Sequence, residues 1–196
     1  MMKREATVRR QTRETSIELA LRLDGEGSAR VDTGIGFLDH LYTALACHAR
    51  FDLELDGKGD LEVDDHHTAE DSALALGQAF DEALGERRGI ARFGHAYAPL
   101  DEALARAVVD LSGRPFAAVD LKLVRDSIGA IACENLGHVL RSFATAARIT
   151  LHVEVLAGEN DHHRAEAAFK AVALALGAAV TRTGAGDVPS TKGVLG

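Results

Sequence analysis

Residues 64–71 read DDHHTAED, and residues 160–167 read NDHHRAEA. Both contain the pattern Asp-His-His-x-x-Glu, and the second copy lies 96 positions after the first. A single histidine in an apolar, helix-like stretch precedes each copy, at His40 and at His138, which are 98 positions apart. Two copies with such similar flanks are improbable by chance. The chain is therefore predicted to be an internal duplication of one structural unit.

The elements expected around the two copies follow the same order in both halves. In the first half, apolar periodicity predicts a strand over 17–23, a turn over 24–27, a partner strand over 29–32 that completes a hairpin, a helix over 37–45, a strand over 51–55 and a helix over 68–84 that Gly85 stops. In the second half, it predicts strands over 104–111 and 116–123 joined by the turn 112–115, a helix over 134–147, a strand over 149–155 and a helix over 164–180.

These elements predict an α+β fold of two β-β-α-β-α units, each a small mixed sheet backed by two helices. We expect residues 1–90 to form the first repeat and residues 91–182 the second. Residues 183–196 lack periodicity and are expected to form a C-terminal arm. No long linker separates the repeats, so they are expected to pack as one compact body.

Composition restricts the class of function. The 196 residues carry a formal net charge of -8, so we expect neither nucleic acid nor a membrane surface as a partner. No apolar stretch is long enough to cross a membrane, and the first residues lack the apolar core of a signal peptide. The two cysteines are too few for a disulfide framework. A cytoplasmic protein that acts on a small molecule is expected.

The duplicated histidine pattern is typical of metal binding. On a helix, residues three and four apart share a face, so Glu70 can lie beside His66 and His67, and Glu166 beside the equivalent pair. Six imidazoles and two carboxylates suffice for two metal ions with three histidines and one glutamate each. Nitrogen and oxygen donors favour Mn²⁺, Fe²⁺, Co²⁺ or Zn²⁺. Adjacent histidines project in different directions, so one pair can serve two ions or two subunits.

A second group of residues suits an anion such as a phosphate. Arginine gives bidentate recognition, and hydroxyl and backbone N–H groups add short donors. The candidates are Arg92, Arg114, Lys170 and the tail segment Pro189-Ser190-Thr191-Lys192-Gly193. Each is a weak signal by itself.

The motifs together resemble those of the imidazoleglycerol-phosphate dehydratase family of histidine biosynthesis, in its monofunctional form. The resemblance covers nearly the whole chain. It rests on the segments RQTRETSI, DTGIGFLDHL, FDLELDGKGDLEVDDHHTAEDSALALGQA, RFGHAYAPLDEAL, DLSGRPF, ENLGHVLRSFA, GENDHHRAEAAFKA and PSTKGVL. It implies a hydro-lyase that converts D-erythro-imidazoleglycerol phosphate to imidazole-acetol phosphate and water. It further implies left-handed βαβ crossovers, a homo-oligomer of 24 subunits built from trimers, and two Mn²⁺ ions per active site at subunit interfaces.

The resemblance also implies roles for particular residues. The metal ligands would be His40, His66, His67, Glu70, His138, His162, His163 and Glu166. Substrate contacts would fall on Glu14, Arg92, Arg114, Lys170, Ser190 and Lys192. Glu14 would be the catalytic acid–base, with Glu70 and Glu166 as metal-bound assistants. Which ligand belongs to which ion stays open.

Two other classes of function remain as alternatives. A binuclear metal-dependent phosphoesterase needs the same metals and arginines, but it would bind the phosphate on the metals rather than on Arg92 and the Ser-Thr-Lys tail. A non-catalytic shell protein assembled by metals would leave those cations without a role.

Overall fold

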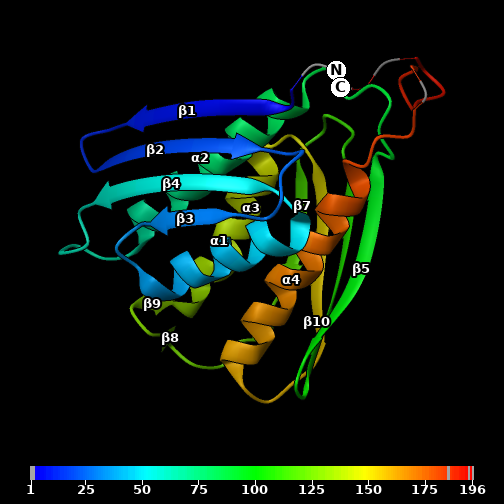
Figure 1. The fold of residues 1–196 in the computed structure, drawn as a ribbon. Helices are drawn as coiled ribbons and strands as arrows, with labels where there is room; N and C mark the ends of the chain where they lie inside the picture. Colours follow the sequence, from blue (N-terminus) through cyan, green and yellow to red (C-terminus); the bar gives the residue numbers. More distant parts are fainter. Residues whose placement is uncertain (1–2, 185, 194, 196) are drawn as a thin grey trace.

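The computed structural model describes residues 3–184, 186–193 and 195 of the chain. Two four-stranded sheets form the outer layers, and four helices pack between them (Figure 1). The first half contains β1 (Glu5–Gln11), β2 (Thr15–Arg22), β3 (Ala29–Asp32), α1 (Gly36–Ala49), β4 (Asp52–Gly59) and α2 (His66–Leu84). The second half contains β5 (Phe93–Leu100), β6 (Ala103–Asp110), β7 (Phe116–Asp120), the short pair β8 (Ser127–Ile128) and β9 (Ile131–Ala132), α3 (Cys133–Ala146), β10 (Thr150–Ala157) and α4 (Asp161–Ala179).

The two sheets have the same topology, and this agrees with the predicted α+β fold of two similar units. The strand order is β1-β2-β4-β3 in the first sheet and β5-β6-β10-β7 in the second. In each sheet the last-named strand pairs parallel with its neighbour, and α1 or α3 connects the two. These parallel connections are where the implied crossovers lie; their left-handed sense stays a prediction.

The predicted hairpin of the first half is wrong. Residues 29–32 do not form a hairpin with residues 17–23, because β3 pairs parallel with β4 and β1 occupies the other edge of β2. The Asp52 carboxylate accepts hydrogen bonds from the backbone N–H groups of residues 26–28, which directs the turn toward the start of β4. In the second half, β6 and β7 likewise flank β10 instead of pairing with each other.

The sequence prediction also missed β1 in the first half, and β5 and the short pair β8 and β9 in the second, so apart from that pair each unit is β-β-β-α-β-α. Only Val8 is fully buried in β1, so that strand shows no apolar alternation. In β5 the residues that face the core have small side chains or none. A Cβ at Gly94 would lie 1.9 Å from the backbone oxygen of Ala175, so α4 packs directly on the strand's main chain.

The helices lie where periodicity predicted them, but α2 and α4 begin earlier. The side chain of Asn160 accepts a hydrogen bond from the backbone N–H of His162, and Asp64 does the same for His66. Both histidine pairs therefore lie in the first turn of a helix. No helix of the described residues is long and apolar enough to cross a membrane.

The described part of the predicted arm, residues 183–193 without residue 185, lies along the segment 89–92. Thr183 donates to the carbonyl of Gly89, and Asp187 accepts from the N–H of the same residue. The arm and the end of α4 lie close together, far from the loop that precedes α4 (Figure 1). Residues 185, 194 and 196 lie outside the described residues.

Candidate metal centres

Two clusters of metal-type donors lie on the surface, and each contains two histidines and one glutamate. The first, the α1/α4 cluster, contains His40 of α1 with His162 and Glu166 of α4. Glu166 Oε2 lies 3.0 Å from Nε2 of His40 and 3.2 Å from Nε2 of His162. This cluster joins a histidine of the first half to two donors of the second half.

The second cluster, the α2/α3 cluster, takes two donors from the first half and one histidine from the second half. His138 of α3 lies beside His66 and Glu70 of α2. Glu70 Oε1 lies 3.2 Å from Nε2 of His138, and Glu70 Oε2 lies 3.8 Å from Nε2 of His66. Helices α2 and α3 pack against each other, as α1 and α4 do, so neighbouring helices from different halves build both clusters.

The donor geometry fits a divalent cation. In each cluster the three ligand atoms lie within 4.8 Å of one another. Ligand atoms at ~2.1 Å from one ion and ~90–110° apart are separated by about 3.0–3.4 Å. The nitrogen and oxygen donors suit Mn²⁺, Fe²⁺, Co²⁺ or Zn²⁺, and no thiolate takes part.

The other histidine of each pair points away from its cluster. His67 places Nδ1 at 3.1 Å from both carboxylate oxygens of Asp60 and Nε2 at 3.8 Å from Glu14. His163 places Nδ1 at 2.7 Å from Glu102. A single chain therefore brings together six of the eight predicted metal ligands and leaves these two outside. Their Nε2 atoms lie near carboxylates instead, that of His67 at 3.8 Å from Glu14 and that of His163 at 3.9 Å from Asp101.

The carboxylates behind these two histidines shift the pKa values of the imidazoles. The hydrogen bond to Asp60 raises the pKa of His67, and the hydrogen bond to Glu102 raises that of His163. The pKa of Glu102 falls to about 2, chiefly because its carboxylate accepts the backbone N–H of Asn160 and then the His163 ring. A carboxylate that accepts from Nδ1–H leaves Nε2 as the donor atom for a metal.

Lys170 is the only predicted anion-binding residue that contacts a cluster within the described chain. Its Nζ lies 2.6 Å from Glu166 Oε1. Burial raises the pKa of Glu166, but the hydrogen bonds with Lys170 and His40 outweigh it and lower the pKa to about 2. The carboxylate is thus ionised, with the Lys170 ammonium group as its counter-ion.

The other anion-binding candidates lie at the opposite end of α4. Arg92 donates to both oxygens of Asp110, at 2.7 and 3.1 Å, and to the carbonyl of Pro189 in the arm. Its backbone N–H binds the carbonyl of Ala179, the last residue of α4, whereas His162 lies in the first turn. At ~1.5 Å per residue, those two ends are about 25 Å apart.

Ser190 and Lys192 follow Pro189 in the arm, and Arg114 lies on the loop between β6 and β7. Leu111, at the start of that loop, donates its backbone N–H to the carbonyl of Arg92. One chain therefore does not place Arg92, Ser190 or Lys192 against the α1/α4 cluster. The prediction that these residues and Lys170 hold one phosphate together is not met within a single chain.

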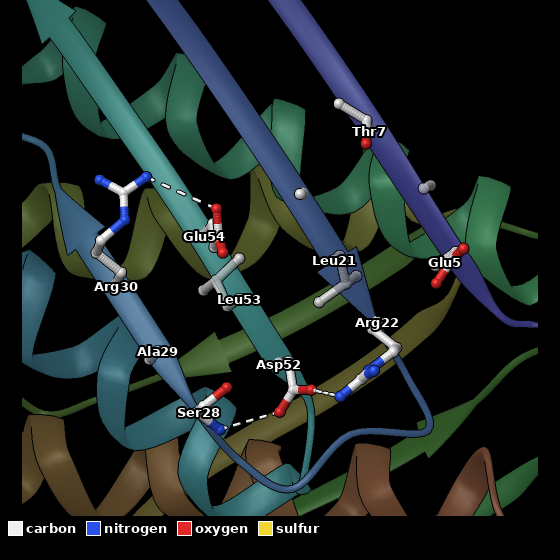
Figure 2. Close-up of a pocket in the computed structure, with 12 residues that line it drawn as sticks. Glu5, Thr7, Leu21, Arg22, Ser28, Ala29, Arg30, Asp52, Leu53 and Glu54 are labelled. Atoms are coloured by element: carbon white, nitrogen blue, oxygen red, sulfur yellow. Dashed lines mark hydrogen bonds and ion pairs between the residues drawn. The ribbon is translucent and has the colours of Figure 1, made fainter.

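A hollow of about 650 Å³ on the outer face of the first sheet contains none of the predicted site residues. Figure 2 shows it bordered by the Arg22–Asp52 and Arg30–Glu54 ion pairs of neighbouring strands. Strand alternation places these charges on the solvent side of the sheet. The hollow is a feature of the sheet surface, separate from the histidine clusters.

Sequence reasoning missed several residues that support the histidines, namely Asp60, Asp101, Glu102 and Asn135. Asn135 Oδ1 lies 2.9 Å from Nδ1 of His66. The duplication gave a signal for Glu102. Strand β5 begins 88 positions after β1, and Glu102 lies 88 positions after Glu14, so the two glutamates hold equivalent positions in the two repeats. Aligning the repeats by their strands would have identified Glu102.

Comparisons with known proteins agree on one family. The family model for imidazoleglycerol-phosphate dehydratase matches residues 33–176. A protein of that name from Schizosaccharomyces pombe is 54% identical, and the match covers 98% of this chain and 100% of that protein. One from Phytophthora nicotianae is 62% identical over 98% of this chain, which spans only 42% of that relative's length. A crystal structure from Pyrococcus furiosus, a complex with (S)-C348, is 37% identical with a TM-score of 0.83, covering 96% of this chain and 100% of that one.

Proposed function

The chain belongs to the imidazoleglycerol-phosphate dehydratase family, and we propose that it performs that family's reaction with two metal clusters, each built from both halves of the chain. The reaction is the removal of water from imidazoleglycerol phosphate in histidine biosynthesis, which makes the protein a hydro-lyase. The match to the Schizosaccharomyces pombe relative spans that whole protein, whereas the Phytophthora nicotianae relative is longer than this chain. The proposed activity therefore rests on the relative that is matched over its full length.

The two alternative functions have no support in these findings. Neither the family model nor the relatives carry the name of a phosphoesterase or of a shell protein.

The α1/α4 and α2/α3 clusters are the proposed sites for two divalent cations, with Mn²⁺ as the first candidate and Fe²⁺, Co²⁺ or Zn²⁺ as alternatives. Such ions act as Lewis acids that lower the pKa of a bound group and hold it in place. Glu70 and Glu166 each lie between two histidines, which positions one carboxylate per ion.

Glu14 is the proposed catalytic acid–base. It lies in the turn between β1 and β2, where Thr12 Oγ1 accepts its backbone N–H. Its side chain is 54% exposed and lies near Nε2 of His67. The carboxylate can therefore accept and return a proton at a metal site to which His67 contributes.

A complete site is proposed to form only between subunits. His67 and His163 lie outside the clusters of their own chain, and Arg92, which contacts Pro189 of the arm, is held at the end of α4 that lies about 25 Å along the helix from His162. Neighbouring copies would supply both groups. The number of subunits comes from the family resemblance, which implies a homo-oligomer of 24 subunits built from trimers, and we propose that assembly for this chain. Cys47 and Cys133 are free thiols, which supports a cytoplasmic location.

The observation that supports this function best is the presence of two equivalent donor clusters in a chain of this family. The test is to incubate the purified protein with imidazoleglycerol phosphate and to measure both imidazole-acetol phosphate and inorganic phosphate. We expect the keto product without phosphate release, loss of turnover after EDTA treatment and recovery with Mn²⁺. Release of inorganic phosphate would favour a phosphoesterase instead.

A further inference from the structure

The two halves of the chain place different residues behind their metal clusters. Phe37 and Asn135 occupy equivalent positions, because each lies three residues before the single histidine of its helix. Lys170 on α4 is likewise equivalent to Leu74 on α2, by the offset that relates Glu166 to Glu70. The duplication therefore provides an internal comparison in which matching donors have different surroundings.

A chain of hydrogen bonds supports the α2/α3 cluster. Asn135 is 5% exposed, its Oδ1 lies 2.9 Å from Nδ1 of His66, and its Nδ2 donates to Asp65 Oδ2 at 3.0 Å. Asp65 Oδ2 also accepts the backbone N–H of Ala132. Because Asp65 fixes the orientation of the amide, the amide oxygen faces His66. This keeps the proton on Nδ1 and leaves Nε2 of His66 as the metal donor.

At the α1/α4 cluster an aromatic ring replaces this acceptor. The ring centroids of Phe37 and His162 lie 4.8 Å apart. Within the part of the chain that the structure describes, Glu166 is the only hydrogen-bond partner of the His162 ring, and it lies at Nε2. Contact with Phe37 restrains the ring without selecting the tautomer that a metal requires.

The charges beside the two glutamates also differ, and this difference again favours metal binding at the α2/α3 cluster. Lys170 Nζ lies 2.6 Å from Glu166 Oε1, so an ammonium group already neutralises the carboxylate that would bind a cation. Leu74 at the equivalent position is apolar, and among the described residues Glu70 pairs with His66 and His138 and with no lysine or arginine. A divalent ion at the α1/α4 cluster would experience the repulsion of Lys170, and one at the α2/α3 cluster would not.

We infer that the two metal sites are unequal: the α2/α3 cluster binds its divalent cation more tightly, and the α1/α4 cluster holds the more exchangeable ion. This inference rests on the proposed function, since it takes each cluster to bind one ion. Hydrogen bonds behind a ligating histidine change metal affinity by ~10–100-fold, and we expect the two dissociation constants to differ by roughly that factor.

Graded chelation of the manganese-loaded protein tests the inference. Samples are equilibrated with increasing EDTA, and the Mn²⁺ retained per chain is measured by elemental analysis. The unmodified protein should release its two ions in two steps. Asn135→Leu should bring the steps together by weakening the tighter site. Glu134→Gln, an exposed neighbour on α3, is the control and should release metal as the unmodified protein does.

A second pair of variants avoids dependence on the buried Asn135. Phe37→Asn introduces an acceptor beside His162 and should bring the steps together by strengthening the weaker site. Phe37→Leu keeps an apolar contact and should leave both steps in place. Thermal denaturation of the metal-free variants shows whether each one folds.

The outcomes separate this inference from the proposed function. If the unmodified protein retains fewer than two Mn²⁺ per chain before chelation, the assignment of the two clusters fails. If two ions leave in one step, or if Phe37→Asn leaves the two steps unchanged, the inference of unequal sites is overturned. The dehydratase proposal stands in that case.

Discussion

At the scale of single residues, Glu14 and Glu102 hold equivalent positions in the two repeats but have different contacts. Glu102 accepts the backbone N–H groups of Glu159 and Asn160 and the His163 ring. The carboxylate of Glu14 has no such anchors among the described residues, and its nearest charged partner is His67 at 3.8 Å. A fixed carboxylate suits the positioning of a metal ligand, and an unanchored one suits proton transfer.

Glu14→Gln is therefore expected to lower kcat by ~10²–10⁴-fold, the usual effect of removing a general acid–base. Metal content and assembly should not change, because Glu14 belongs to neither cluster. Glu102→Gln is the matched comparison and should instead reduce bound Mn²⁺, since it loosens His163. Steady-state kinetics and elemental analysis of both variants check this; near-normal turnover of Glu14→Gln would remove Glu14 from the mechanism.

At the scale of elements, the helices and the inner strands were predictable because their apolar residues recur at regular intervals. The interval is three to four residues in the helices and two in the strands. Strand β2 buries every second side chain, from Thr15 to Leu21. The charged edge strand β1 gives no such signal, and the pairing of β3 with β4 depends on long-range contacts that local sequence does not encode. The duplicated donors were predictable from their spacing. Their distribution between two clusters was not, because it depends on which helices of opposite halves pack together.

The contact of α4 with β5 makes Gly94 a sensitive position. An added Cβ would lie 1.9 Å from the Ala175 backbone oxygen, so the helix or the strand would have to move. We expect Gly94→Ala to lower the free energy of unfolding by about 1–3 kcal/mol, as overpacking usually does. Urea denaturation of the metal-free protein measures this. Gly36→Ala, where a Cβ meets nothing within 4 Å, is the control, and equal stability of the two variants would contradict the close packing.

Asp24 joins the start of β1 to the end of α4 through Arg4 and Arg182. The pKa of Asp24 is lowered to about 2, chiefly by the hydrogen bond from Arg4; burial opposes this, and the hydrogen bond from Arg182 lowers the pKa further. Because the folded pKa is lower than the unfolded one, the stabilisation is complete above about pH 4 and disappears as the pH falls through about 2.

Asp24→Asn should accordingly reduce the free energy of unfolding at pH 7 by about 1 kcal/mol or less, since Asp24 is 43% exposed. The difference from the unmodified protein should shrink as the pH approaches 2. Urea denaturation at a series of pH values tests this, and a difference that stayed constant with pH would show that the ion pairs are not its source.

At the scale of the whole molecule, the donors of the proposed site are divided among surfaces that one chain cannot bring together. Each cluster offers two histidines and one glutamate, and the remaining histidine of each pair faces away with its Nδ1 held by a carboxylate. A neighbouring copy that supplied this histidine would complete the three-histidine, one-glutamate set expected from sequence. Metal binding and assembly would then be one coupled equilibrium, because an ion that binds only the assembled form stabilises it by mass action.

We therefore expect EDTA to shift the assembled protein toward smaller oligomers, and Mn²⁺ at neutral pH to restore both size and activity.

Acid should act in the same direction, because an imidazole must be neutral to bind a metal. Hydrogen bonds to Asp60 and Glu102 raise the pKa of His67 and His163 above its usual value, so protons compete with the ions for these two ligands as the pH falls. Excess Mn²⁺ should therefore oppose dissociation by acid, and Asp60→Asn, which removes the carboxylate that raises the pKa of His67, should move the dissociation to lower pH. Light scattering against pH, with and without excess Mn²⁺, measures the shift. A metal-free protein of unchanged mass would mean that contacts between the chains hold the assembly together without the ions.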